Sequence, residues 1–157
     1  MVGLGFVLLS LTGAFASPEA DCQNRFLGAW EYRQRAGDGY DNEGERIEVS
    51  CTNGSMQGLY FGLEREGEHG LFYTLVELTE LKVGSNGDLA FTVPERDLFI
   101  ERPKSLQEVK QKRLTSAGFT RDELHLRGRL HEHKLVLACT SKGRSCPEDV
   151  MVFSKGT

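Results

Sequence analysis

Residues 46–63 read RIEVSCTNGSMQGLYFGL, and this stretch predicts a β-hairpin. Ile47, Val49 and Cys51 alternate with polar residues, as expected of a strand that buries one face. Asn53-Gly54 follows at once, and this dipeptide readily adopts the positive φ angles of a two-residue type I′ turn. A second alternating run after the turn completes the hairpin.

The same alternation recurs along most of the chain. Further runs lie at residues 30–32, 71–83, 89–93, 124–130, 135–139 and 150–153. Leucines in the run 71–83 also fit a helical spacing, but its β-branched and aromatic residues favour a strand with a bend near Thr79-Glu80. The total is eight or nine strands. The sequence therefore predicts one all-β domain, an antiparallel barrel or sandwich.

One short helix is expected, near residues 105–114. Arg102-Pro103-Lys104 ends a strand, Ser105 can cap the helix, and Glu108 stands in the capping-box position. Its apolar edge is thin, which places the helix on the surface of the β structure.

The N-terminal stretch resembles a signal peptide. Met1 to Ala16 is uncharged and largely apolar, and it ends in the small-x-small sequence Ala14-Phe15-Ala16. Cleavage after Ala16 would leave residues 17–157 as a single β domain, exported to a periplasm or secreted. A membrane anchor is the alternative, but about 15 apolar residues fall short of the roughly 20 needed to span a bilayer. We therefore expect no stable membrane anchor.

Four cysteines in an exported chain indicate two disulfides. Cys139 and Cys146 flank a short polar loop that a disulfide would close, which leaves Cys22 to pair with Cys51. The alternative crosses these pairs and joins Cys51 to Cys139. Because no two cysteines have CxxC spacing, the sequence does not favour a zinc site.

Charge is distributed unevenly along the chain. Residues 17–101 hold seven Lys/Arg and seventeen Asp/Glu, a balance of −10, whereas residues 102–144 hold eleven and four, a balance of +7. The two halves either neutralise each other across neighbouring strands or form a basic face for an acidic partner. Nucleic acid is not expected as a partner, because the pI is about 5.6 and the basic stretch lacks interleaved aromatic residues.

No metal or cofactor site is predicted. His131 and His133 share a strand parity that could ligate a metal, but basic neighbours and a hairpin position favour a solvated turn. The acidic loop 38–45 resembles a calcium loop in composition but not in spacing. Asn53-Gly54-Ser55 is also an N-glycosylation sequon.

The motifs of common catalytic sites are missing. The sequence contains no G-x-S-x-G elbow, no P-loop and no dinucleotide-binding fingerprint. It therefore favours a binding protein over an enzyme, and two kinds of binding protein are open.

In the first, a small apolar ligand lies in a cavity or cleft lined by inward-facing side chains. The predicted lining residues are Leu59, Phe61, Leu63, Phe91 and Val93. The alternative is that these side chains simply fill a solid core.

In the second, the chain is a protein-binding or inhibitor module that contacts its partner through loops. Its predicted contact residues are Lys142 and Arg144 in the loop between two cysteines, with His131 and His133 in the neighbouring turn.

Phe26, Gly28 and Trp30 form an F-x-G-x-W sequence that resembles the opening motif of lipocalins. The resemblance implies an eight-stranded antiparallel barrel in which the tryptophan closes one end beneath an apolar cavity. The second lipocalin motif, a T-D-Y-like turn, is missing, and the predicted helix precedes the last three strands rather than following the barrel. In size, export and disulfides the chain is also similar to the small β-barrel lysozyme inhibitors of bacterial envelopes.

Overall fold

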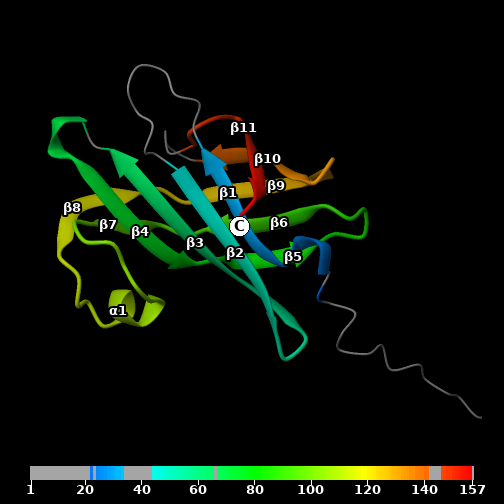
Figure 1. Ribbon diagram of the computed structural model, residues 1–157, viewed down its shortest axis with the longest axis horizontal. Coiled ribbons are helices and arrows are strands. Elements are labelled where there is room, and N and C mark those ends of the chain that lie inside the picture. The colour runs from blue at the N-terminus through cyan, green and yellow to red at the C-terminus, as the bar shows by residue number, and fades with distance from the viewer. Residues whose placement is uncertain (1–21, 23, 34–43, 66, 142–145, 157) are drawn as a thin grey trace, which may run out of the picture.

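The computed structural model describes residues 22, 24–33, 44–65, 67–141 and 146–156. This part of the chain forms eleven antiparallel strands, one short helix and two 3₁₀ turns (Figure 1). The strands are β1 (Gly28–Arg33), β2 (Gly44–Thr52), β3 (Ser55–Arg65), β4 (Leu71–Glu77), β5 (Thr79–Val83), β6 (Leu89–Val93), β7 (Arg96–Phe99), β8 (Ser116–Arg121), β9 (Leu124–His131), β10 (Lys134–Ser141) and β11 (Val150–Lys155). The remaining elements are α1 (Leu106–Lys110) and the 3₁₀ turns η2 (Asn24–Phe26) and η3 (Gly67–His69). The all-β prediction is confirmed.

All eleven strands belong to one sheet, in the order β5-β6-β9-β10-β11-β1-β2-β3-β4-β7-β8. The sheet curls into a half-barrel, with β2, β3 and β4 in front of β6 and β9 in Figure 1. The ends of this order are joined covalently, because β4 continues into β5, β6 into β7 and β8 into β9. The pairing between β4 and β7 is short, since a single pair of residues, Tyr73 and Phe99, defines its register.

The strand count differs from the expected eight or nine because three extended runs are bent. The breaks fall at Leu78, at Pro94-Glu95 and at Asp122-Glu123. Proline has no N–H to donate to a ladder, and the N–H of Leu78 turns to the carbonyl oxygen of Gly58 at 2.8 Å. If β4–β5, β6–β7 and β8–β9 are each counted as one bent strand, the sheet has eight strands. Each of these eight strands is paired with the strand on either side of it.

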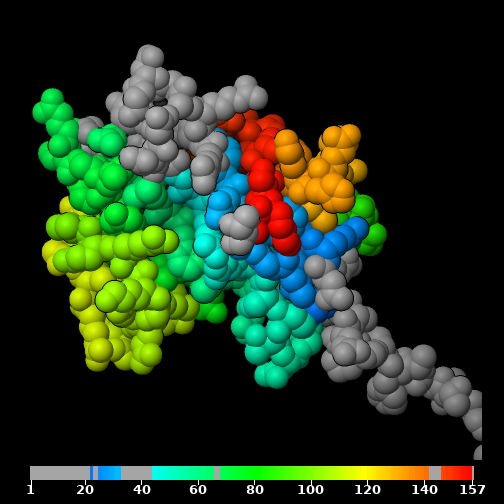
Figure 2. Space-filling model, in the orientation of Figure 1, coloured from blue at the N-terminus to red at the C-terminus, as the bar shows by residue number. Residues whose placement is uncertain are grey.

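The hairpin predicted from residues 46–63 is present. β2 pairs with β3 from Gly44 opposite Leu63 to Thr52 opposite Ser55. The turn residues Asn53 and Gly54 have φ angles of 53° and 79°, the positive values that a type I′ turn requires. In the space-filling view of Figure 2 this hairpin and the α1 segment project as two separate lobes.

The core lies on the inner face of the curled sheet. Trp30 is 2% exposed, and its indole Nε1 donates a hydrogen bond of 2.8 Å to the carbonyl oxygen of Phe26. Ile47 and Tyr60 follow in the same register row, and Met151 and Phe153 of β11 are fully buried. At roughly 25 cal/mol per Å² of apolar surface removed from water, this burial is the main source of stability.

The helix α1 begins as predicted but ends earlier. Ser105 is the N-cap, and its hydroxyl accepts a hydrogen bond from the backbone N–H of Glu108 at 3.3 Å. The helix ends at Lys110 rather than near residue 114, and Lys112 has a φ angle of 52°, which is incompatible with continuation. None of its residues is buried, and Lys110 pairs with Glu77 of β4 at 3.2 Å, so the expected surface position is confirmed.

Both disulfides of the favoured pairing are present. Cys22 is joined to Cys51 and Cys139 to Cys146, with Cα–Cα distances of 5.8 and 6.0 Å. The first links the segment before β1 to the end of β2, and the second joins β10 to the segment before β11. The crossed alternative is excluded.

Acidic and basic halves of the chain meet across neighbouring strands. Glu64 of β3 pairs with Arg121 of β8, and Asp88 lies 3.1 Å from Arg129 of β9. These contacts support neutralisation between the two halves rather than full segregation of charge.

Candidate ligand-binding site

The five predicted lining residues divide between the two faces of the sheet. Phe91 and Val93 are buried in the core. Leu59, Phe61 and Leu63 were expected to face inward, but they are only half-buried and lie on the opposite side of β3 from the core. The structure therefore corrects the inward assignment for these three residues.

Glycines explain the reversed face of β3. Its buried positions are Gly58, Tyr60 and Gly62, so one large side chain stands between two residues without side chains. A Cβ at Gly58 would lie 2.5 Å from Leu78 Cδ1, and one at Gly62 would lie 2.7 Å from Thr74 Cγ2. A side chain at either position would therefore collide with Leu78 or Thr74, which explains the glycines on both sides of Tyr60.

Polar side chains line the inner face one register row beyond the apolar core. Tyr32 of β1 pairs with Glu45 of β2. On the other side of β2, Glu45 pairs with Gly62 of β3, and Gly62 in turn pairs with Thr74 of β4. Direct cross-strand partners share one face of a sheet, so these residues form a continuous row. Arg96 of β7 reaches the same region, since its guanidinium Cζ lies 5.0 Å from the ring centroid of Tyr60.

Besides Tyr32, whose hydroxyl is in the same condition, four residues of this region carry buried polar atoms that make no hydrogen bond of normal geometry. The atoms are Glu45 Oε2, Tyr60 Oη, Thr74 Oγ1 and Arg96 Nε. Their residues are 9%, 0%, 2% and 5% exposed, respectively. Buried polar atoms are nearly always hydrogen-bonded in native proteins. The Tyr60 hydroxyl and the Glu45 carboxyl act on each other as hydrogen-bond partners, so Thr74 Oγ1 and Arg96 Nε are the atoms most open to a further polar contact.

Burial shifts the ionisation of the acidic groups in this cluster. It raises the pKa of Glu45 from 4.5 to about 7, against the opposing effects of the Tyr60 hydroxyl and the Arg96 guanidinium. Burial also raises the pKa of Tyr60 well above 10, with the Glu45 carboxylate adding to the effect. Burial and the carboxylates of Glu148 and Glu45 raise the pKa of Tyr32 to about 12. Near neutral pH, Glu45 is the group of the cluster that changes charge.

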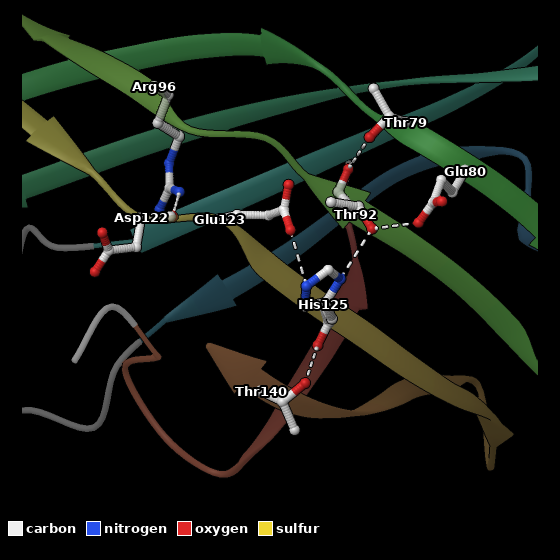
Figure 3. Close-up of polar contacts among 8 residues, drawn as sticks. All are labelled: Thr79, Glu80, Thr92, Arg96, Asp122, Glu123, His125 and Thr140. Atoms are coloured by element: carbon white, nitrogen blue, oxygen red, sulfur yellow. Dashed lines mark hydrogen bonds and ion pairs between the residues drawn. The ribbon is translucent and has the colours of Figure 1, made fainter. Parts of the chain in front are cut away.

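Two polar contacts hold Arg96 in place. Its Nη1 donates to the backbone carbonyl oxygen of Asp122 at 2.7 Å, as Figure 3 shows. Its Nη2 lies 3.8 Å from Glu64 Oε1, and Glu64 is also paired with Arg121. The bend between β8 and β9 thus fixes a guanidinium whose Nε remains without a partner.

A second polar cluster lies on the outer side of β5, β6 and β9 (Figure 3). The Thr92 hydroxyl donates to Glu80 Oε2 at 3.0 Å and lies 3.1 Å from His125 Nδ1, while His125 Nε2 lies 2.9 Å from Glu123 Oε1. Because Thr92 is 4% exposed, its hydroxyl joins three strands rather than presenting a nucleophile.

The residues predicted to bind a partner lie partly outside the described residues. His131 and His133 are exposed at the β9–β10 turn, where Glu132 and His133 have φ angles of 47° and 66°. Both side chains thus lie at an exposed turn, and their contact with a partner stays a prediction. Lys142 and Arg144 fall in the segment 142–145, outside the described residues.

Neither a metal cluster nor a membrane-spanning helix occurs in the described part of the chain. No three His, Cys, Asp or Glu side chains there are arranged to hold a metal ion, and no helix there has the length and apolar character needed to cross a bilayer. The expected signal peptide, residues 1–16, and most of the acidic loop 38–45 lie outside the described residues and stay predictions.

Comparison of the chain with protein-family models, with curated proteins and with solved structures finds no match. The lipocalin-like sequence at Phe26, Gly28 and Trp30 therefore stays a resemblance of sequence.

Sequence reasoning missed the polar cluster. Glu45 has the parity of Ile47 and Val49, so extending their alternation by one step would have placed it on the inner face. No comparable signal marks Arg96, which stands in a short strand after a proline and reaches Tyr60 only through the fold.

Proposed function

We propose that this chain is an exported, disulfide-stabilised binding protein that holds a small ligand at the polar end of its half-barrel. The observation that carries the proposal is the set of four buried polar atoms on Glu45, Tyr60, Thr74 and Arg96 that make no hydrogen bond of normal geometry. Ligand sites are mostly apolar with a few convergent polar groups, and here the polar row adjoins the apolar row of Trp30 and Ile47.

The energetics favour an occupant that forms hydrogen bonds. A buried polar atom left without a partner costs about 1–3 kcal/mol. A ligand that pairs with several of these atoms would recover part of that cost on binding. The apolar ligand expected from the sequence is accordingly refined to one with both an apolar part and a polar group.

Export is supported by the two disulfides, which persist in oxidising compartments. It is also consistent with the apolar sequence of residues 1–16.

Binding of Nile red, an uncharged fluorescent probe, tests the proposal. We expect saturable binding to one site per chain. Thr74→Val should weaken it about fivefold, because one hydrogen bond is worth about 1 kcal/mol. The matched control is Thr120→Val at an exposed position of β8, which should bind as the parent does. Non-saturable binding, or equal losses in both variants, would refute the proposal.

A second candidate function is protein binding through the outer face of β10 and β11. Val150 and Val152 are 49% and 43% exposed, unusual for valines in strands, and Arg127 and Arg129 are exposed nearby on β9. In this case an acidic envelope protein should shift the chain in gel filtration. Lys142→Glu or Arg144→Glu should abolish that shift while leaving Nile red binding unchanged.

A further inference from the structure

We infer that the ligand of the polar cluster carries a carboxylate, bound by Arg96 Nε–H and by the hydroxyls of Tyr60 and Thr74, and that Glu45 takes up a proton as it binds. The inference rests on the proposed function and specifies the chemical class of its ligand.

The available atoms of the cluster are mainly donors. Arg96 Nε–H can only donate, while the hydroxyls of Tyr60 and Thr74 can each donate one hydrogen bond. A protonated Glu45 adds a fourth donor, whereas an ionised Glu45 can only accept. Several donors converging on one place suit an oxyanion, because hydrogen bonds to a charged acceptor are about twice as strong as neutral ones.

The charges around the cluster point the same way. The groups that face Glu45 come from several strands. They are Tyr32 of β1, Tyr60 and Glu64 of β3 and Arg96 of β7, with Arg121 of β8 paired to Glu64. Glu148, which precedes β11, faces Tyr32. When Glu45 is protonated, the guanidiniums of Arg96 and Arg121 balance the carboxylates of Glu64 and Glu148, so an anion at the centre of the cluster meets no excess of negative charge.

Glu45 couples binding to pH. A carboxylate placed beside an ionised Glu45 would meet a like charge in a buried site, which strongly disfavours ionisation of both groups. Burial has already raised the pKa of Glu45 to about 7. Below that pH the anion meets a donor. Above it, binding of each ligand draws one proton from the solvent onto Glu45.

Calorimetric titration with octanoate, and with 1-octanol as an uncharged match, tests the inference on the oxidised chain. Measurements at pH 6, 7 and 8 in two buffers of different protonation enthalpy count the protons taken up. We expect octanoate to bind at least tenfold more tightly than octanol at pH 6. Between pH 7 and 8 its affinity should fall about fivefold, with nearly one proton taken up per octanoate at pH 8.

Variants separate the roles of the residues. Glu45→Gln should abolish both proton uptake and the pH dependence of octanoate binding, while Glu77→Gln, at an exposed carboxylate of β4, should change neither. Arg96→Gln should reduce octanoate affinity to that of octanol. Because Arg96 is buried and its loss could prevent folding, Thr74→Val serves as the second test, with a smaller loss for octanoate.

Equal binding of octanoate and octanol at every pH would overturn the carboxylate inference and leave the proposed function standing. A preference for octanoate that keeps its pH dependence in Glu45→Gln would overturn the role of Glu45. If neither compound nor Nile red binds, the proposed function itself is refuted.

Discussion

Replacement of Glu45 by glutamine should make the protein more stable at alkaline pH. Glu45 is buried on the inner face of β2, and burial raises its pKa from 4.5 to about 7. Glutamine has nearly the same shape and stays neutral at every pH. The substitution therefore removes the charge and little else.

The size of the effect follows from the two pKa values. The folded state favours the protonated carboxyl, so the stability linked to Glu45 is fully present below pH 4.5 and is lost as the pH rises through 7. At about 1.4 kcal/mol for each pH unit between the two values, the loss is about 3 kcal/mol. Glu45→Gln should escape this loss.

Urea unfolding of the oxidised chain between pH 4.5 and 8.5 measures the effect. We expect the difference in unfolding free energy between Glu45→Gln and the parent to grow by about 3 kcal/mol over this range, with unchanged m-values. A difference in unfolding free energy that is the same at every pH does not affect the test, because the test measures how that difference changes with pH. Glu77→Gln, with its half-exposed side chain, should show a flat difference. A flat difference for Glu45→Gln as well would refute the buried, neutral carboxyl.

Three further experiments test individual contacts of the fold. Gly62→Ala should destabilise the fold by about 1–3 kcal/mol in urea, because the new Cβ would lie 2.7 Å from Thr74 Cγ2. Replacing the cysteines of the disulfide that spans 29 positions should cost about 1 kcal/mol more than replacing those of the seven-position disulfide, as the loop-entropy relation requires; a reversed order in thermal melts would contradict this. Thr92→Val should lose about 1 kcal/mol by leaving Glu80 and His125 without their shared partner, and an unchanged melting temperature would argue against that contact.

Local patterns predicted the local structure well. Asn53-Gly54 marked its turn because few other dipeptides tolerate two positive φ angles, and Ser105 with Glu108 marked the helix start because a cap is a matter of adjacent residues. The short loop between Cys139 and Cys146 marked a disulfide for the same reason, since its geometry depends on few intervening residues.

Features that depend on the rest of the fold were harder to predict. The inner face of β3 was misassigned because size was taken as the mark of burial, whereas Gly58 and Gly62 are the buried neighbours that make room for Tyr60. Glu45 and Arg96 come close together only because the whole sheet curls. No short sequence pattern predicts that curl.

The pairing of β1 with β11 has a consequence for how the molecule is made. Trp30 lies opposite Lys155, and Met151 and Phe153 of the same late strand complete the wall around the tryptophan. The sheet cannot be completed before β11 has been made, because the pairing joins residues more than 120 positions apart. Such distant contacts slow folding, so the apolar residues around Trp30 stay accessible to water until β1 and β11 have paired.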